Sequence, residues 1–158
     1  MSEILTEIGI EAPAELVWAI LTDFRTYARW NPFIRAVSGR AAPGRTVEVT
    51  LLHGSAEITS SQILLNVTAP RELRWRGRFR LPGLFEKEHK FRIDAKRGGG
   101  VRFRQVQSFR GLLAPLFSRK RNRDVEHDCA QMNEALKARA EKAYTTAVEA
   151  QSLEERNR

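Results

Sequence analysis

The stretch that decides the fold reads RELRWRGRFRL, residues 71–81. Between positions 74 and 80 every second residue is an arginine, and tryptophan, glycine and phenylalanine stand between them. Side chains of a β-strand point alternately to the two faces of a sheet, so this period of two predicts a strand. The basic face carries Arg74, Arg76, Arg78 and Arg80, and the apolar face carries Leu73, Trp75 and Phe79. We therefore expect a sheet with one face against a core and the other in water.

Six segments with strand character follow one another from residue 33, and turn residues separate them. They cover residues 33–40, 45–52, 56–69, 72–81, 84–95 and 100–111. Residues 3–12 also alternate like a strand, and residues 14–23 and 24–30 have the spacing of two short helices. Apolar residues recur every three or four positions from Val125 to Ala147, which is typical of a long amphipathic helix. The pattern predicts an α+β fold in which this helix covers an antiparallel sheet.

Length and composition suit one domain, because the chain has 158 residues of which 42% are hydrophobic. We expect this domain to span residues 1–148 and the charged tail, residues 149–158, to fray because it has little to bury. No apolar run approaches the ~20 residues of a membrane span, and residues 1–15 do not resemble a secretory signal. The single Cys129 excludes an internal disulfide and indicates a cytoplasmic protein.

The formal net charge of +8 could attract an anionic membrane, nucleic acid or an acidic ligand, and the alternative is a solvated basic surface. The outer arginines could contact lipid or nucleic-acid phosphates. However, Glu86, Glu88 and Asp94 are expected on the same face and could pair with them. The aromatic residues lie on the opposite face, so the stacking surface of single-strand binders is missing. We therefore do not expect nucleic acid as a partner; a transient contact with an anionic membrane is better supported than nucleic-acid binding, and the solvated surface remains the favoured alternative to both.

Three polar residues fall on strand faces that are otherwise apolar: His89, Gln105 and Gln107. A buried polar group without a partner costs about 1–3 kcal/mol. These residues therefore either satisfy one another in the core or contact water or a ligand in a cavity. Their occurrence on neighbouring strands favours a pocket, since small-molecule sites are mostly apolar with a few polar groups. Lys87 shares this face but lies near a strand end, where its flexible stem can reach solvent.

Several motifs, in this order, resemble a known family. They are IEAPAELVWAILTDFRTYARWNPFI (10–34), LRWRGRF (73–79), EHKFRI (88–93), QSFRGLLAPL (107–116) and MNEALKARAE (132–141). The chain is similar to START-like (SRPBCC) helix-grip proteins, in particular the bacterial polyketide cyclase/dehydrase and lipid-transport group. The resemblance implies a curved seven-stranded antiparallel sheet wrapped around a long C-terminal helix, with two short helices after the first strand. It also implies a deep apolar cavity for lipids, sterols, quinones, polyketides or other apolar molecules.

We expect the protein to bind or carry a small apolar molecule in this cavity, such as a lipid, polyketide, quinone or aromatic compound. The expected wall residues are Trp30, Trp75, Phe79, His89, Phe91, Phe103, Gln105, Gln107, Phe109, Arg121, Met132 and Leu136. Arg121 would meet a ligand carboxylate or an inner polar group, and its alternative is a solvated arginine on a surface loop. No cofactor and no metal are expected, because the ligand-type residues of EHDC, 126–129, point in different directions on a helix.

The alternative function is an enzyme of the polyketide cyclase/dehydratase type. His89 is then the candidate for proton transfer, because an unperturbed histidine titrates near neutrality. Gln105 or Gln107 could orient a carbonyl oxygen, and no pair of carboxylates lies on the expected inner face. The resemblance adds that many relatives carry an acidic residue at the position of Gln107, which disfavours catalysis here. The sequence leaves the oligomeric state open.

Overall fold

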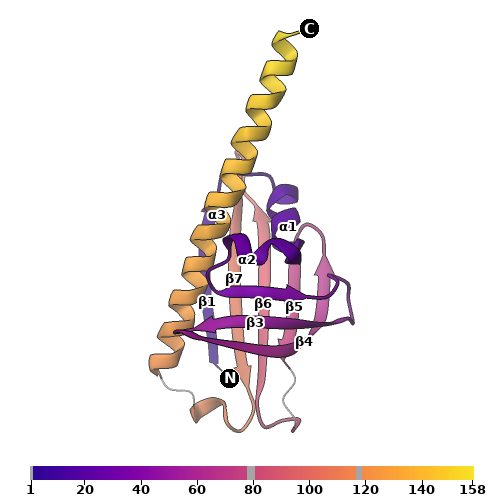
Figure 1. The fold of residues 1–158 in the computed structure, drawn as a ribbon. Helices are drawn as coiled ribbons and strands as arrows, with labels where there is room; N and C mark the ends of the chain where they lie inside the picture. Colours follow the sequence, from indigo (N-terminus) through magenta and orange to yellow (C-terminus); the bar gives the residue numbers. More distant parts are fainter. Residues whose placement is uncertain (1, 78–80, 117–118) are drawn as a thin grey trace.

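The sheet of this protein curves around one long helix. The computed structural model describes residues 2–77, 81–116 and 119–158, without the side chains of residues 119–121. The strands are β1 (Ser2–Ile10), β2 (Ile34–Ser38), β3 (Thr46–His53), β4 (Ala56–Thr68), β5 (Glu72–Gly77), β6 (Glu86–Ala95) and β7 (Val101–Arg110). Within these residues they form one seven-stranded sheet in the order β1-β7-β6-β5-β4-β3-β2 (Figure 1). Every neighbouring pair is antiparallel, as the short turns predicted.

Two short helices follow β1, as expected. Pro13 is the N-cap of α1 (Ala14–Thr22), and Val17 and Leu21 bury the inner side of that helix. A 3₁₀ turn, Phe24–Thr26, leads into the single turn of α2 (Tyr27–Trp30). Asn31 ends α2, and its Oδ1 accepts hydrogen bonds from the backbone N–H groups of Phe33 at 3.0 Å and Ile34 at 2.8 Å. This side chain fixes the direction in which the chain enters β2.

The hairpin between β6 and β7 turns on three successive glycines. Gly98, Gly99 and Gly100 have φ values of 86°, 107° and 73°, which side chains with a Cβ rarely adopt. The predicted hairpin is confirmed, and it aligns His89 of β6 directly opposite Gln107 of β7. The described part of β5 ends at Gly77, so Arg78, Phe79 and Arg80 of the opening motif lie outside the described residues.

The last helix, α3 (Arg119–Arg156), extends well past the sheet (Figure 1). Its apolar stripe is buried at Val125, Cys129, Met132, Leu136 and Ala140. Beyond Ala140 the apolar residues of α3 are no longer fully buried, and Ala147 is exposed. The tail that we expected to fray is helical to Arg156, since neither glycine nor proline interrupts residues 116–158. None of the described helices is long and apolar enough to cross a membrane.

Candidate ligand-binding cavity

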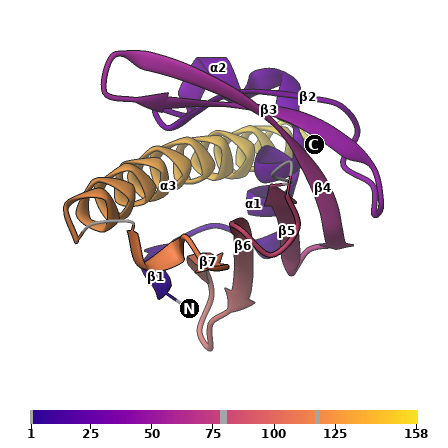
Figure 2. The same ribbon diagram turned by 90° about the horizontal axis from the view of Figure 1, so that it is seen from below.

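A cavity of about 380 Å³ lies between the curved sheet and the first half of α3. Figure 2 shows the curvature of the sheet, since β2 and β3 pass on one side of α3 and β1, β7 and β6 on the other. The lining residues lie on β3 to β7 and α3 and directly before β2 and β6: Phe33, Leu51, His53, Ile58, Ser60, Ser61, Gln62, Gly77, Phe85, Lys87, Phe109, Val125 and Asp128. The cavity is therefore formed jointly by sheet and helix.

Apolar side chains make up most of the wall. Phe85 and Phe109 stack with ring centroids 6.0 Å apart, and both are buried. Phe33, directly before β2, and Val125 of α3 complete the apolar wall. Ile58 is 54% exposed although it lines the cavity, so it lies at the mouth. This composition suits an apolar molecule that enters past Ile58.

Charged groups from three elements border the same cavity: His53, Lys87 and Asp128. Lys87 Nζ lies 5.9 Å from the centroid of the Phe109 ring, within the range of a cation–π contact. Burial raises the pKa of the Asp128 carboxyl, while the charges of His53, His127 and Lys87 oppose this rise. The Asp128 carboxyl group therefore keeps its proton to a higher pH than an ordinary aspartate does.

A polar pair from β4 depends on a glycine of β5. Gln62 Nε2 donates a hydrogen bond of 2.8 Å to Ser60 Oγ. Gly77 is paired with Gln62 across the two strands, and a Cβ on Gly77 would lie 3.1 Å from Gln62 Nε2. The missing side chain of Gly77 therefore gives the Gln62 amide its place in the cavity wall.

Next to this cavity lies a closed hydrogen-bond network between β6, β7 and α3. Gln105 Nε2 donates to the Cys129 carbonyl oxygen at 3.1 Å and to Asn133 Oδ1 at 2.7 Å. Gln105 Oε1 lies 2.8 Å from His89 Nε2 and can act only as an acceptor, so the histidine donates from Nε2. Burial, helped by the charge of Lys87, lowers the pKa of His89 to about 3. His89 is therefore a neutral histidine with a fixed tautomer.

Gln107 and Cys129 form a second, incomplete contact in the same layer. Gln107 Nε2 donates to Cys129 Sγ at 3.1 Å, and burial raises the pKa of this thiol to about 11. Gln107 Oε1 is buried and has no hydrogen-bond partner among the described residues. The amide nitrogen of Gln107 thus has a hydrogen-bond partner, and its amide oxygen has none within the described residues.

A family model described as polyketide cyclase / dehydrase and lipid transport matches residues 1–141, most of the 158-residue chain. The chain belongs to this family. The family's START-like fold is also found in solved structures, although no curated sequence matches the chain. A START superfamily protein from Mycobacterium smegmatis is 15% identical with a TM-score of 0.71, and the match covers 89% of this chain and 98% of that one.

Two further similar structures are an aromatase/cyclase, ZhuI, from Streptomyces sp. R1128 and the protein TTHA0849 from Thermus thermophilus. ZhuI is 20% identical with a TM-score of 0.65, over 89% of this chain and 94% of its own. TTHA0849 is 14% identical with a TM-score of 0.71, over 90% of this chain and 99% of its own. At these identities the likeness establishes the shared fold, and the expected helix-grip architecture is confirmed.

The lining of this cavity differs from the wall residues that the sequence predicted. Phe109 is the one predicted wall residue that lines it within the described part of the chain. Eight others are packed in the core: Trp75, His89, Phe91, Phe103, Gln105, Gln107, Met132 and Leu136. The aromatic rings fill the space, since the centroid of Phe91 lies 5.0 Å from that of Trp75 and 4.0 Å from that of His89. These packed side chains therefore occupy the space in which the sequence predicted a pocket.

The remaining three predicted residues are Trp30, Phe79 and Arg121. Trp30 is half-buried with its ring 5.1 Å from that of Tyr27, and its Nε1 has no hydrogen-bond partner among the described residues. It does not line the cavity. Phe79 and the side chain of Arg121 lie outside the described residues.

Sequence reasoning missed most of the polar lining. Ser60 and Gln62 share the face of Ile58 and Leu64 on β4, so their alternation was a usable signal. Asp128 was considered only as a metal ligand, and that role was rejected because the side chains of residues 126–129 cannot converge on one ion. It follows Val125 by three residues, however, so the two share one side of α3, and both line the cavity.

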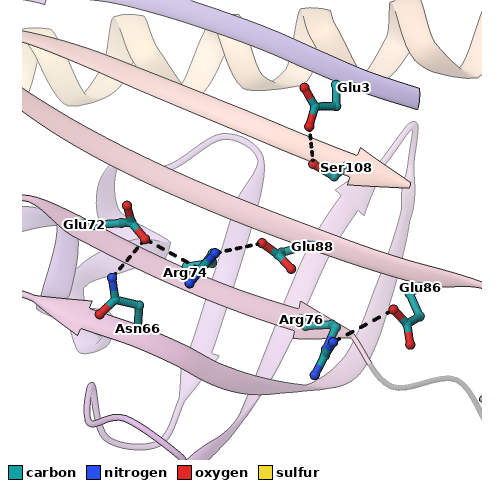
Figure 3. A network of polar contacts seen from close by, with 8 residues as sticks. All are labelled: Glu3, Asn66, Glu72, Arg74, Arg76, Glu86, Glu88 and Ser108. Atoms are coloured by element: carbon teal, nitrogen blue, oxygen red, sulfur yellow. Dashed lines mark hydrogen bonds and ion pairs between the residues drawn. The ribbon is translucent and has the colours of Figure 1, made fainter. Parts of the chain in front are cut away.

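Carboxylates neutralise much of the positive charge on the outer arginine face. Arg74 lies 3.6 Å from Glu72 and 3.5 Å from Glu88, and Arg76 lies 3.9 Å from Glu86 (Figure 3). Arg92 and Arg104 both contact Asp94. The pairs Arg74–Glu88, Arg76–Glu86 and Arg104–Asp94 are cross-strand contacts as expected, and the other two lie within one strand. They leave fewer free charges for phosphate groups than the arginine alternation alone suggests.

Proposed function

We propose that the protein binds a small apolar molecule in the cavity between the sheet and α3. The observation that carries this proposal is the cavity itself, with aromatic and aliphatic walls and an open mouth at Ile58. The family description names polyketide chemistry and lipid transport, both of which involve apolar molecules. The volume of about 380 Å³ is at the small end of ligand sites, which favours a compact ligand.

The polar lining restricts the ligand further. Lys87, Asp128 and His53 border a mostly apolar space, and Gln62 and Ser60 add an amide and a hydroxyl. A ligand with an oxygen or nitrogen function can hydrogen-bond to groups of this kind, whereas a pure hydrocarbon cannot. The favoured ligand therefore has an apolar body and at least one oxygen or nitrogen function.

Native mass spectrometry of the freshly purified protein, with solvent extraction of what it releases, tests the proposal. Ser60→Trp places a large side chain in the cavity, and Thr59→Trp on the same exposed strand is the matched control, because Thr59 does not line the cavity. An extra mass carried by wild type and Thr59→Trp but not by Ser60→Trp is the expected result. Equal loading of all three proteins would contradict the proposal.

A second candidate function, acid–base catalysis, is favoured by Asp128 and not by His89. His89 is buried, bonded to Gln105 and neutral, whereas Asp128 borders the cavity with a raised pKa. A carboxyl group of this kind can exchange a proton with a bound carbonyl compound. Asp128→Asn should then keep ligand binding while the compound extracted from the protein changes. Identical extracts from wild type and variant would rule out this candidate.

A further inference from the structure

A second hollow, a groove of about 320 Å³, lies between β1 and α3. It is lined by Leu5, Thr6, Glu7 and Ile8 of β1 and by Glu126, Ala130, Asn133 and Glu134 of α3. None of these residues lines the cavity described above. Figure 1 shows β1 at the edge of the sheet, running beside α3. The groove therefore combines a strand edge with the side of a helix.

The outer edge of β1 presents backbone groups without strand partners. β1 pairs with β7 on one side and is the first strand in the sheet order, so within the described chain its other side is unpaired. Lys137 Nζ donates to the Gly9 carbonyl oxygen at 3.1 Å, so the backbone of Gly9 points outward. Since alternate residues of a strand point the same way, the N–H and C=O groups of Leu5 and Glu7 also point outward. Leu5 is 55% exposed.

Carboxylates border this edge although the chain carries a net charge of +8. Glu126 and Glu134 stand two turns apart on α3, about 12 Å along its axis, with the small Ala130 between them. Glu7 completes the acidic border from β1. Arg104 lies opposite Glu7 on β7, but its guanidinium contacts Asp94. In the described part of the chain the three glutamates form no ion pair.

A buried hydroxyl in the groove also has no partner. Thr6 is 9% exposed and lines the groove, and its Oγ1 makes no hydrogen bond among the described residues. Asn133 lies beside it with its Oδ1 already bound to Gln105. A buried hydroxyl of this kind is usually satisfied by water or a ligand.

We propose that this groove binds an extended peptide segment with basic side chains, which adds a strand to the outer edge of β1. The backbone groups of Leu5 and Glu7 supply the main-chain hydrogen bonds, as in other cases of strand addition. Glu126 and Glu134 receive lysine or arginine side chains. Residues four apart in a strand are about 14 Å apart, close to the glutamate spacing, so basic residues at positions i and i+4 fit.

The test uses a fluorescein-labelled peptide of sequence TKVTVKT, whose two lysines have this spacing, and fluorescence anisotropy at low salt. One control peptide carries glutamate at both lysine positions. Another, TKVPPKT, keeps the charges but cannot form a regular strand. We expect saturable binding of TKVTVKT, and binding at least about tenfold weaker for both controls, because charge and strand pairing contribute together. Equal binding of TKVPPKT would overturn strand addition.

Two protein variants locate the site. Ala130→Lys fills the groove and neutralises its acidic side, whereas Ala138→Lys adds the same charge to an exposed position of α3 outside the groove. Ala130→Lys should lose binding, and Ala138→Lys should keep it. In hydrogen exchange, the peptide should slow the amides of Leu5 and Glu7. Full binding by Ala130→Lys, or no binding by wild type, would refute the proposal; the glutamates would then serve to keep the edge of β1 unpaired.

Discussion

His89 Nε2 donates a hydrogen bond of 2.8 Å to Gln105 Oε1 in the layer between the sheet and α3. The same glutamine donates to Asn133 and to the Cys129 carbonyl oxygen, so one side chain of β7 joins β6 to the helix. These contacts leave little freedom for the residues beside the cavity. The network of His89, Gln105 and Asn133 therefore forms a rigid support beside the cavity, against which a ligand can be held.

Replacing His89 with glutamine should reduce the pH dependence of stability. The pKa of His89 is about 3 in the folded protein and 6.5 in the unfolded chain, so the unfolded state takes up the proton first as the pH falls. Stability should fall between pH 6.5 and about 3, by up to about 1.4 kcal/mol per pH unit from this group. Urea unfolding across this range measures the slope. An unchanged slope in the variant would show that His89 is not the group responsible.

Gln105 and Gln107 should respond in opposite ways to the same substitution. Gln105→Leu leaves His89 Nε2 and Asn133 Oδ1 without this partner and should destabilise by about 3 kcal/mol or more. Gln107→Leu removes a buried acceptor that has no donor, at the loss of one contact to sulfur. We expect a change between about 0 and 1 kcal/mol, in the stabilising direction. Urea unfolding midpoints, compared at constant m-value, measure both changes. Equal losses of stability in the two variants would contradict this account.

The thiol of Cys129 should be unreactive in the folded protein. It is buried, and its pKa of about 11 leaves almost no thiolate at neutral pH. We expect labelling by iodoacetamide to be slow and to rise steeply with urea, because it requires unfolding. Fast labelling in native buffer would show that α3 opens away from β7.

Glu141 should stabilise the junction of β1 and α3 above its titration range. Its carboxylate accepts from Lys137 Nζ at 2.6 Å and from the Glu11 backbone N–H at 3.0 Å, and these donors hold its pKa below the usual 4.5. The contribution is present above pH 4.5 and is lost as the pH falls through the lower folded value. Glu141→Gln should cost less than about 1 kcal/mol at neutral pH, since the site is near the surface. Thermal unfolding measures it, and Glu149→Gln on the exposed end of α3 is the control.

The sequence was sufficient to predict the strands, the hairpin at Gly98–Gly100 and the long helix, because periodicity reports which face each residue takes. It was not sufficient to identify the residues that line the cavity. Strand phase puts Trp75, Phe91 and Phe103 on the inner face but does not reveal that their rings fill the space there. The empty space depends on sheet curvature and on where α3 begins, and both arise from contacts between distant residues.

The order of the elements has a consequence for synthesis on the ribosome. β1 pairs with β7 in a register that joins Ser2 to Phe109, and α3 covers the core only after both strands exist. The growing chain must therefore keep Leu73, Phe91 and Phe103 without their final cover until about residue 140 has emerged. Such long-range closure slows folding and exposes nascent chains to aggregation. We therefore expect its nascent chain to need chaperones more than that of a helical bundle of equal length.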